Sequence, residues 1–235
     1  MRRFFYNQPN SLQVGSTVPL TEEIFHHWCK VLRASIGEQA LFFDGQGGEY
    51  TVTLTDITKK QALVTINDFN PINRDLPFTV NIALVMSRGE RMDYAIQKAT
   101  ELGVTTIQLL TSDRCEMRLK YDRDQKKLDH WQSVAVAACE QCGMNIVPKV
   151  LAPISIEEWI QTDLPISRLV MAPNKDQKNV LLDAQPELAL LIGPEGGLSE
   201  SEIELSNQHG FVNWCIGDRV LRTETAPVVA LSILN

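Results

Sequence analysis

The amino-acid sequence predicts an α/β protein in which a small β-barrel over residues 1–72 precedes a larger domain with a parallel sheet over residues 73–235. The larger domain is indicated by apolar runs that alternate with helical patterns from Phe78 onward, because such alternation builds a parallel sheet with helices on both faces. The smaller domain is indicated by short runs rich in β-branched and aromatic residues. A polar stretch with two prolines, residues 70–77, marks the boundary between them.

In the first domain, residues 39–43 are apolar and run into an Asp-Gly turn signal, which is typical of a strand in a hairpin. Residues 50–54 alternate between polar and apolar, and residues 62–66 are apolar and β-branched, so both are predicted strands. One helix precedes them, because Thr21 suits the N-cap and apolar residues recur at helical spacing as far as Leu32.

In the second domain strands alternate with helices from Phe78 onward. Its strands are predicted at residues 80–86, 105–110, 169–172, 188–192 and 211–216. Its helices are predicted at residues 92–102 and 128–142, after Ser199, and from Pro227 to the end. The first two helices stop before Gly103 and Gly143, and glycine suits the residue after a helix. The last helix is apolar nearly all round, so we expect it to be buried in a subunit interface or under loops.

Two loops near the end of the chain follow predicted strands and contain residues suited to a ligand site. Residues 193–197 read Gly-Pro-Glu-Gly-Gly, and residues 217–225 read Gly-Asp-Arg-Val-Leu-Arg-Thr-Glu-Thr. Parallel sheets bind ligands at the carboxyl ends of their strands, where both loops lie. Taken alone, the first loop is also explained by a tight turn before a helix, and Arg222 with Glu224 by a simple ion pair.

Several common kinds of site lack their sequence signatures. The chain contains neither GxGxxG nor GxxxxGK[ST], which argues against dinucleotide-binding and P-loop folds. It contains no HExxH and no histidine cluster, so no metal site is predicted. It contains no GxSxG, which argues against a hydrolase with a serine nucleophile. The glycine loop instead suits a neutral or cationic ligand held by main-chain groups.

Charge and cysteine content narrow the class of protein further. The formal net charge is −7, and residues 128–235 carry 6 Lys/Arg against 14 Asp/Glu, so any nucleic acid would meet local basic patches. The five scattered cysteines are expected to be reduced thiols, including the pair Cys139 and Cys142 within a helical pattern. With no signal peptide and no apolar run of membrane-spanning length, we expect a cytoplasmic protein without a membrane anchor.

Two motifs, in order, resemble those of a known family. Residues 191–199, Leu-Ile-Gly-Pro-Glu-Gly-Gly-Leu-Ser, and residues 217–226, Gly-Asp-Arg-Val-Leu-Arg-Thr-Glu-Thr-Ala, resemble the signature of the SPOUT-class 16S ribosomal RNA uridine-N3 methyltransferases, the RsmE family. The resemblance extends over essentially the whole chain. Further similar segments are residues 86–92 and 97–104, residues 138–143 with Pro148, and His27 with residues 31–33.

The resemblance implies features that physical reasoning alone would not predict. It implies a PUA-like N-terminal barrel and a C-terminal SPOUT domain with a deep trefoil knot, although threaded chains are almost absent from ordinary folds. It also implies a homodimer, S-adenosylmethionine as methyl donor, and 16S ribosomal RNA or the small ribosomal subunit as substrate.

The resemblance places the methyl donor at the ends of three strands. Backbone groups and apolar walls there can hold an adenine and a sulfonium without a phosphate loop, and the acidic last third suits a cationic donor. The implied donor-binding residues are Met171, Ala172, Pro173, Ile192, Gly193, Glu195, Gly196, Gly197, Ile216, Gly217, Val220 and Leu221.

The reaction itself demands that a uridine N3 lose its proton and that negative charge on the uracil oxygens be stabilised. We expect Arg222 to stabilise that charge, and Glu224 to orient Arg222 or to relay the proton. Basic residues of both domains are candidates for RNA contacts, Arg88 and Arg91 for the target nucleotide itself. The predicted RNA-binding residues are Arg2, Arg3, Arg33, Arg88, Arg91, Arg114 and Arg118, with Lys30 and Lys120 beside them. The chain departs from the family pattern after Gly143, where the arginine that often follows is Met144.

Two other functions remain open. One is a SPOUT methyltransferase acting on tRNA or on a ribose 2′-hydroxyl, which the N-terminal barrel and the second loop argue against. The other is a non-catalytic RNA-binding or ribosome-assembly factor, which the intact glycine loop and Arg222 argue against.

Overall fold

The computed structural model describes residues 1–8, 11–115, 121–172 and 186–235. The chain forms two compact units. The first consists of Met1–Asp75 with Cys139–Val147, and the second of Leu76–Ala138 with Pro148–Asn235. Segment 139–147 therefore belongs to the first unit, whereas the sequence analysis assigned it to the second domain.

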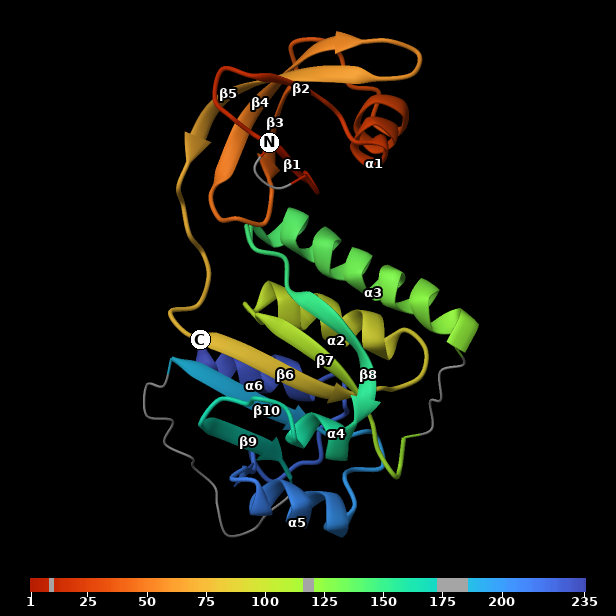
Figure 1. Ribbon diagram of the computed structural model, residues 1–235, viewed down its shortest axis with the longest axis vertical. Helices are drawn as coiled ribbons and strands as arrows, with labels where there is room; N and C mark the ends of the chain where they lie inside the picture. Colours follow the sequence, from red (N-terminus) through yellow and green to blue (C-terminus); the bar gives the residue numbers. More distant parts are fainter. Residues whose placement is uncertain (9–10, 116–120, 173–185) are drawn as a thin grey trace. The chain divides into compact units, whose positions relative to one another are not determined.

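The first unit contains one sheet with strand order β1-β3-β4-β5-β2 (Figure 1). Strands β1 and β3 are parallel and the other pairs antiparallel. In the described chain β1 and β2 are its two edges, so the predicted barrel is not closed by hydrogen bonds between them. The strands are β1 (Arg2–Phe5), β2 (Thr17–Pro19), β3 (Gln39–Phe43), β4 (Glu49–Ile57) and β5 (Ala62–Asn70).

The three strands predicted in this unit are confirmed as β3, β4 and β5, whereas the short β1 and β2 were not predicted. The predicted helix is two elements, α1 (Glu22–Ile24) and a π-helix η1 (Phe25–Val31). Thr21 is the N-cap, as predicted, and accepts a hydrogen bond from the Ile24 amide. The sequence pattern did not distinguish this wider turn from an α-helix. In the π-helix Trp28 is fully buried and packs against Phe4 and Phe42.

A buried ion-pair network joins the sheet of the first unit to segment 139–147. The Glu49 carboxylate pairs with Arg3 and Arg74, and its side chain is 6% exposed. The Arg3 guanidinium also donates to the side-chain oxygen of Asn145 at 2.6 Å, and Arg74 donates to the Gly143 carbonyl at 2.9 Å. Arg3 is therefore occupied inside the unit. Its side chain is 10% exposed and both of its terminal guanidinium nitrogens have protein partners, which argues against the predicted RNA contact.

Replacing Glu49 with glutamine is expected to destabilise the protein by about 3 kcal/mol at pH 7, because two arginines then lose a buried counter-charge. Burial raises the pKa of Glu49, but hydrogen bonds from Arg74 and Arg3 outweigh it, so the pKa lies below its ordinary 4.5. A lowered pKa contributes stability that is present above pH 4.5 and lost as pH falls through the folded-state value. Urea unfolding at several pH values would measure this. As pH falls below 4.5, the free energy of unfolding should decrease more steeply in the wild type than in the Glu49→Gln protein.

The exposed Asp68→Asn variant is the matched control for this prediction, because it removes one carboxylate from the same sheet without breaking a buried pair. A Glu49→Gln protein as stable as the Asp68→Asn protein at pH 7 would contradict the structural role of the network.

The second unit contains a fully parallel sheet with strand order β11-β9-β10-β6-β7-β8. The predicted parallel sheet is thus confirmed. Its strands are β6 (Thr79–Val85), β7 (Thr106–Thr111), β8 (Lys149–Ser155), β9 (Ser167–Met171), β10 (Glu187–Ile192) and β11 (Val212–Trp214). Its helices are α2 (Arg91–Glu101), α3 (Tyr121–Cys142), α4 (Ile156–Ile160), α5 (Glu200–Gln208) and α6 (Ala226–Leu234).

Helices cover both faces of this sheet, with α4 in front of it and α6 behind it in Figure 1. On the first face, Val85 of β6 and Leu191 of β10 pack in one apolar cluster with Trp159 of α4. On the other face α6 contacts α2. Both faces are needed because β10 is buried from Leu188 to Ile192 without interruption.

Strand β8 and helix α4 were not predicted. β8 is an edge strand with a proline, Pro153, and several exposed residues, so it lacks the apolar run by which the central strands are detected. α4 is only five residues long, too short for periodicity to show, although Ser155 and Glu158 form a full capping box.

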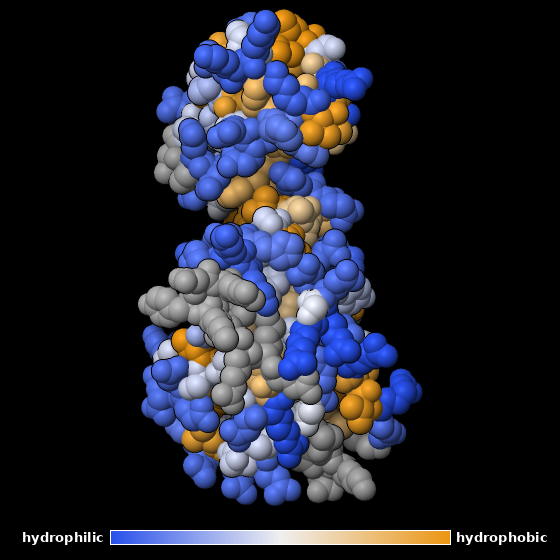
Figure 2. All heavy atoms as spheres, turned by 90° about the vertical axis from the view of Figure 1, so that its right-hand side faces the viewer, coloured by the Kyte–Doolittle hydropathy of each residue, from blue (hydrophilic) through white to orange (hydrophobic). Residues whose placement is uncertain are grey.

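Surface composition adds one finding. Figure 2 shows a largely hydrophilic face on which hydrophobic side chains form small separate groups. Among the described residues, no helix has the length and apolar character needed to cross a bilayer.

Candidate functional site

The carboxyl ends of three neighbouring strands meet at Met171, the last residue of β9. Met171 pairs in register with Ile192 of β10 on one side and with Trp214 of β11 on the other. The glycine loop, residues 193–199, follows β10, and the arginine loop, residues 215–225, follows β11. The two predicted loops therefore leave the sheet on either side of β9, at the carboxyl edge where parallel sheets bind ligands.

The glycine loop is a tight turn that closes on itself. The Gly197 amide donates to the Pro194 carbonyl at 2.9 Å, and Gly197 has a φ of +69°. A Cβ on Gly193 would lie 2.9 Å from Leu198 Cγ and 3.1 Å from the Leu198 amide nitrogen. Leu198 is buried in the apolar cluster under α4, so it cannot easily yield. The glycine at position 193 is thus required by the loop's own packing.

The residues after β7 hold this loop from outside. Arg114 donates to the carbonyls of Gly196 at 3.0 Å and Leu198 at 3.3 Å. The Asp113 carboxylate accepts from the Ser199 hydroxyl at 2.9 Å. Ser199 is also the N-cap of α5, in the capping box that the sequence predicted.

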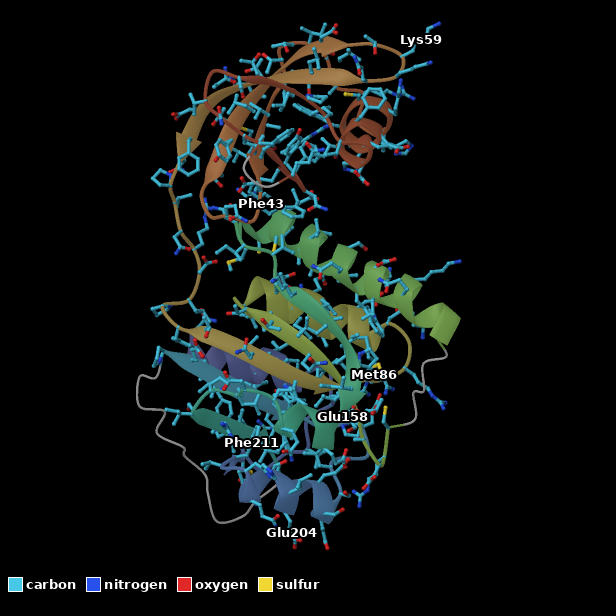
Figure 3. All side chains as sticks on the ribbon, viewed as in Figure 1. Phe43, Lys59, Met86, Glu158, Glu204 and Phe211 are labelled. Carbon is cyan, nitrogen blue, oxygen red and sulfur yellow. The ribbon has the colours of Figure 1, made fainter. Side chains whose placement is uncertain are left out.

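The residues after β6 reach the same loop. Arg91, at the start of α2, forms an ion pair with Glu195 at 2.6 Å, and both side chains are partly exposed. Met86, labelled in Figure 3, ends the apolar run of β6, and its carbonyl accepts from the Cys115 thiol at 3.2 Å. Loops from β6, β7 and β10 thus form one connected rim.

The arginine loop is more open. The Arg222 side chain is 79% exposed, and its nearest guanidinium nitrogen lies 3.8 Å from a Glu224 carboxylate oxygen. Glu224 is only 14% exposed, and its other oxygen is buried with no hydrogen-bond partner in the described chain. Thr223 between them is buried, and the Thr225 amide donates to the Arg222 carbonyl at 2.9 Å. This local turn presents Arg222 to solvent while holding Glu224 inward.

The structure distributes the remaining predicted residues as follows. Ala172 is buried after β9, Ile216 and Leu221 are half-buried, and Gly217 and Val220 are exposed on the arginine loop. Arg2 and Arg33 are exposed on the first unit, as is Arg88 on the second. Pro173, Arg118 and Lys120 lie outside the described residues.

The hydrogen bonds between the glycine loop and residues Asp113 and Arg114 could not be predicted from the sequence, because the partners are more than 80 residues apart. The five cysteines are free thiols, as predicted. Burial raises the pKa of the Cys139 thiol to about 12, the opposite of what a reactive Cys-x-x-Cys pair needs.

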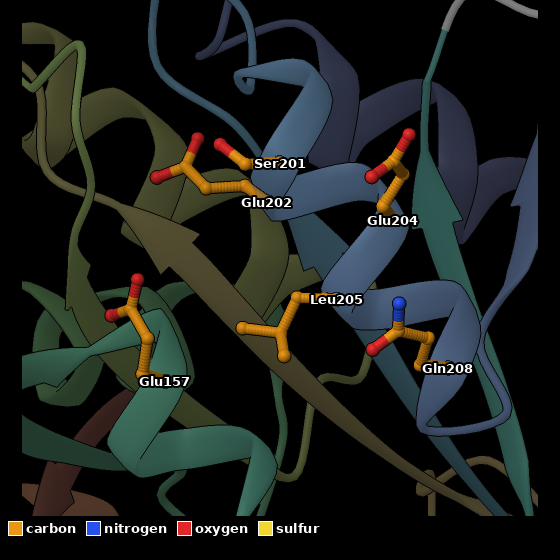
Figure 4. Close-up of a pocket in the computed structure, with 6 residues that line it drawn as sticks. All are labelled: Glu157, Ser201, Glu202, Glu204, Leu205 and Gln208. Carbon is orange, nitrogen blue, oxygen red and sulfur yellow. The ribbon is translucent and has the colours of Figure 1, made fainter.

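A hollow of about 310 Å³ lies between α4 and α5 (Figure 4). Its lining is Glu157, Ser201, Glu202, Glu204, Leu205 and Gln208. The carboxylates do not converge as metal ligands would, and no group able to hold a metal occurs among the described residues.

Comparisons with known proteins identify both parts of the chain. Residues 74–235 match the family model described as an RNA methyltransferase domain, and residues 20–67 match an RNA methyltransferase PUA domain. The chain is 30% identical to the ribosomal RNA small subunit methyltransferase E of Bacillus subtilis, over 100% of this chain and 96% of that protein. It is 32% identical to the protein of the same name from Buchnera aphidicola, over 95% and 92% of the two chains.

Solved structures of methyltransferases are also similar to this chain. A putative methyltransferase of Legionella pneumophila, in complex with bound SAM, superposes with a TM-score of 0.93 at 37% identity, over 99% of this chain and 96% of that one. A ribosomal RNA small subunit methyltransferase E of Neisseria gonorrhoeae, bound to S-adenosylmethionine, gives 0.91 at 36%, over 100% and 96%. This chain therefore belongs to the RNA methyltransferase family.

Proposed function

We propose that this protein transfers a methyl group from S-adenosylmethionine to N3 of a uridine in 16S ribosomal RNA, within the small ribosomal subunit or a precursor of it. The observation that carries the proposal is the convergence at Met171, where the glycine loop and the arginine loop leave the strands on either side of β9. Two relatives with structures at 36% and 37% identity bind this donor, which supports the same donor here.

The residues at the strand ends fit the donor chemically. Ile192 and Ala172 are buried apolar residues at these strand ends and Met171 is half-buried, and the glycine loop brings main-chain groups with three glycines among its residues 193–197. Glu195 and Glu224 bring negative charge suited to a sulfonium cation. The buried hydroxyl of Ser87 and the inner oxygen of Glu224 have no hydrogen-bond partner in the described chain, as expected where a polar ligand belongs. When bound, the donor supplies an electrophilic methyl group.

The acceptor chemistry falls to the arginine loop. The exposed Arg222 guanidinium is free to approach the uracil oxygens and to stabilise the negative charge that develops as N3 loses its proton. Glu224, 3.8 Å away, is placed to orient that guanidinium or to accept the proton. The inward position of Glu224 favours a role within the site over a surface ion pair.

RNA beyond the target nucleotide would meet Arg2 and Arg33 on the first unit, which are exposed. Arg88 on the second unit is also exposed and stays a candidate for the target nucleotide itself. Arg91 is engaged with Glu195, so it would have to exchange that partner for RNA. Phosphate contacts of this kind make the affinity fall as salt rises.

We further propose that the catalytic unit has the knotted SPOUT topology and acts as a homodimer in the cytoplasm, where its RNA substrate would be found. Support for the dimer comes from α6, in which Ala230 and Leu231 are buried but Ile233 remains 57% exposed. An apolar helix with one uncovered side suits an interface between two copies.

The test combines calorimetry with nucleoside analysis. S-adenosylmethionine should bind the purified protein, and 16S ribosomal RNA from cells lacking the enzyme should gain one methyl group on a uracil base. A methyl group on a ribose would instead assign the ribose methyltransferase alternative, and RNA binding without donor binding would assign the non-catalytic factor.

A further inference from the structure

The glycine loop is held at its middle and at its C-terminal end by Asp113 and Arg114, which lie shortly after β7. At its middle, Arg114 donates to the Gly196 and Leu198 carbonyls, and a Cβ on Gly196 would already be 3.4 Å from the Arg114 Cβ. At its end, the Asp113 carboxylate accepts from the Ser199 hydroxyl. The loop and the dipeptide are thus in direct contact over several residues.

Glu202, on the first turn of α5 (Figure 4), completes the connection. It is 2% exposed, and both carboxylate oxygens are used. One accepts from the Ser199 amide at 2.7 Å, and the other accepts from the Asp113 amide at 2.9 Å. A buried carboxylate that bridges two backbone amides fixes their separation, because leaving either unpaired would cost the desolvation of a buried polar group.

These contacts decide which main-chain groups of the loop remain for a ligand. The carbonyls of Gly196 and Leu198 are taken by Arg114, and the Gly197 amide and the Pro194 carbonyl are taken by each other. The loop's shape therefore depends on Arg114 as well as on its own glycines.

We propose that Arg114 and Glu202 are positioning residues that fix the conformation of the glycine loop for the methyl donor, and that Arg114 acts through this loop and not as an RNA contact. The inference rests on the proposed function, since it takes the glycine loop as a donor-binding element. It replaces the role that the sequence alone suggested for Arg114.

The experiment uses the full-length protein with Arg114→Ala and Glu202→Gln. Glutamine preserves the capping box, because its carbonyl still accepts from Ser199, but turns an NH₂ group toward the Asp113 amide. Both variants should bind S-adenosylmethionine roughly tenfold more weakly, the size expected when hydrogen bonds to a charged group are lost. KM for RNA and kcat at saturating donor should stay near the wild-type values. Lys127→Ala, an exposed residue on α3 with the same charge change as Arg114→Ala, is the control.

The outcomes separate this inference from the function on which it rests. Wild-type protein that does not bind the donor would overturn the proposed function itself. Wild-type affinity in both variants would overturn the inference alone. An Arg114→Ala protein with normal donor affinity, a raised KM for RNA and a shallower salt dependence would assign Arg114 to RNA.

Discussion

Arg222→Ala is expected to lower kcat by roughly 10²- to 10³-fold, the cost of removing one group that stabilises developing negative charge in a transition state. Donor affinity should stay within about twofold, because Arg222 is 79% exposed and reaches out from the arginine loop. Single-turnover methylation of RNA, together with donor titration, would measure both quantities.

Arg219→Ala is the matched control, since Arg219 is an exposed arginine on the same loop and its loss changes the net charge equally. If both variants lose activity to the same modest degree, the loop acts through general attraction for RNA. If Arg222→Ala retains normal turnover, the assignment of Arg222 to the uracil oxygens fails.

The sequence predicted most of the second unit because the signals for its elements are local. β10 is a continuous apolar run, Ser199 and Glu202 form a capping box, and Gly103 ends α2 with a φ of +85°. Each of these depends on residues within one turn or one strand. The parallel sheet then follows from the alternation of such elements.

What the sequence could not predict depends on partners distant along the chain. Arg3 pairs with Glu49 and Asn145, which lie 46 and 142 residues away. The residues next to Arg3 in the sequence therefore do not indicate that it is buried. An arginine near the start of a β-rich domain looks the same whether it meets RNA or a buried carboxylate. The exposed Arg2 beside it shows that adjacent residues of one strand point to opposite sides.

The candidate site divides in the same way. The alternation of strands and helices does not predict the order of the strands in the sheet. The structure shows that β9 lies between the strands that carry the two loops, because Met171 pairs with residues of both. Arg114 contacts the glycine loop only through tertiary packing. In the sequence it lies in a basic segment, which suggested an RNA contact instead. Glycine content indicates an unusual turn but not which atoms crowd it.

Gly193→Val is expected to weaken donor binding more than the other substitutions of the glycine loop. Even a single added carbon at this position would lie 2.9 Å from Leu198 Cγ and 3.1 Å from the Leu198 amide nitrogen, and the second of these atoms is backbone. Leu198 is anchored in the apolar cluster with Val170 and Leu191, so the loop must move instead. We expect donor affinity to fall by more than about 10²-fold, because the ligand would meet a differently shaped loop.

Gly196→Ala provides the graded comparison, because its new carbon would meet only the Arg114 side chain, at 3.4 and 3.6 Å. That side chain can shift, so donor affinity should fall only severalfold. Calorimetric titration of both variants, with thermal unfolding to confirm that each is folded, would rank them. A folded Gly193→Val protein that binds the donor as tightly as Gly196→Ala would show that the loop adjusts freely, and the donor would then have to be held by the ends of β9 and β11 and by the arginine loop.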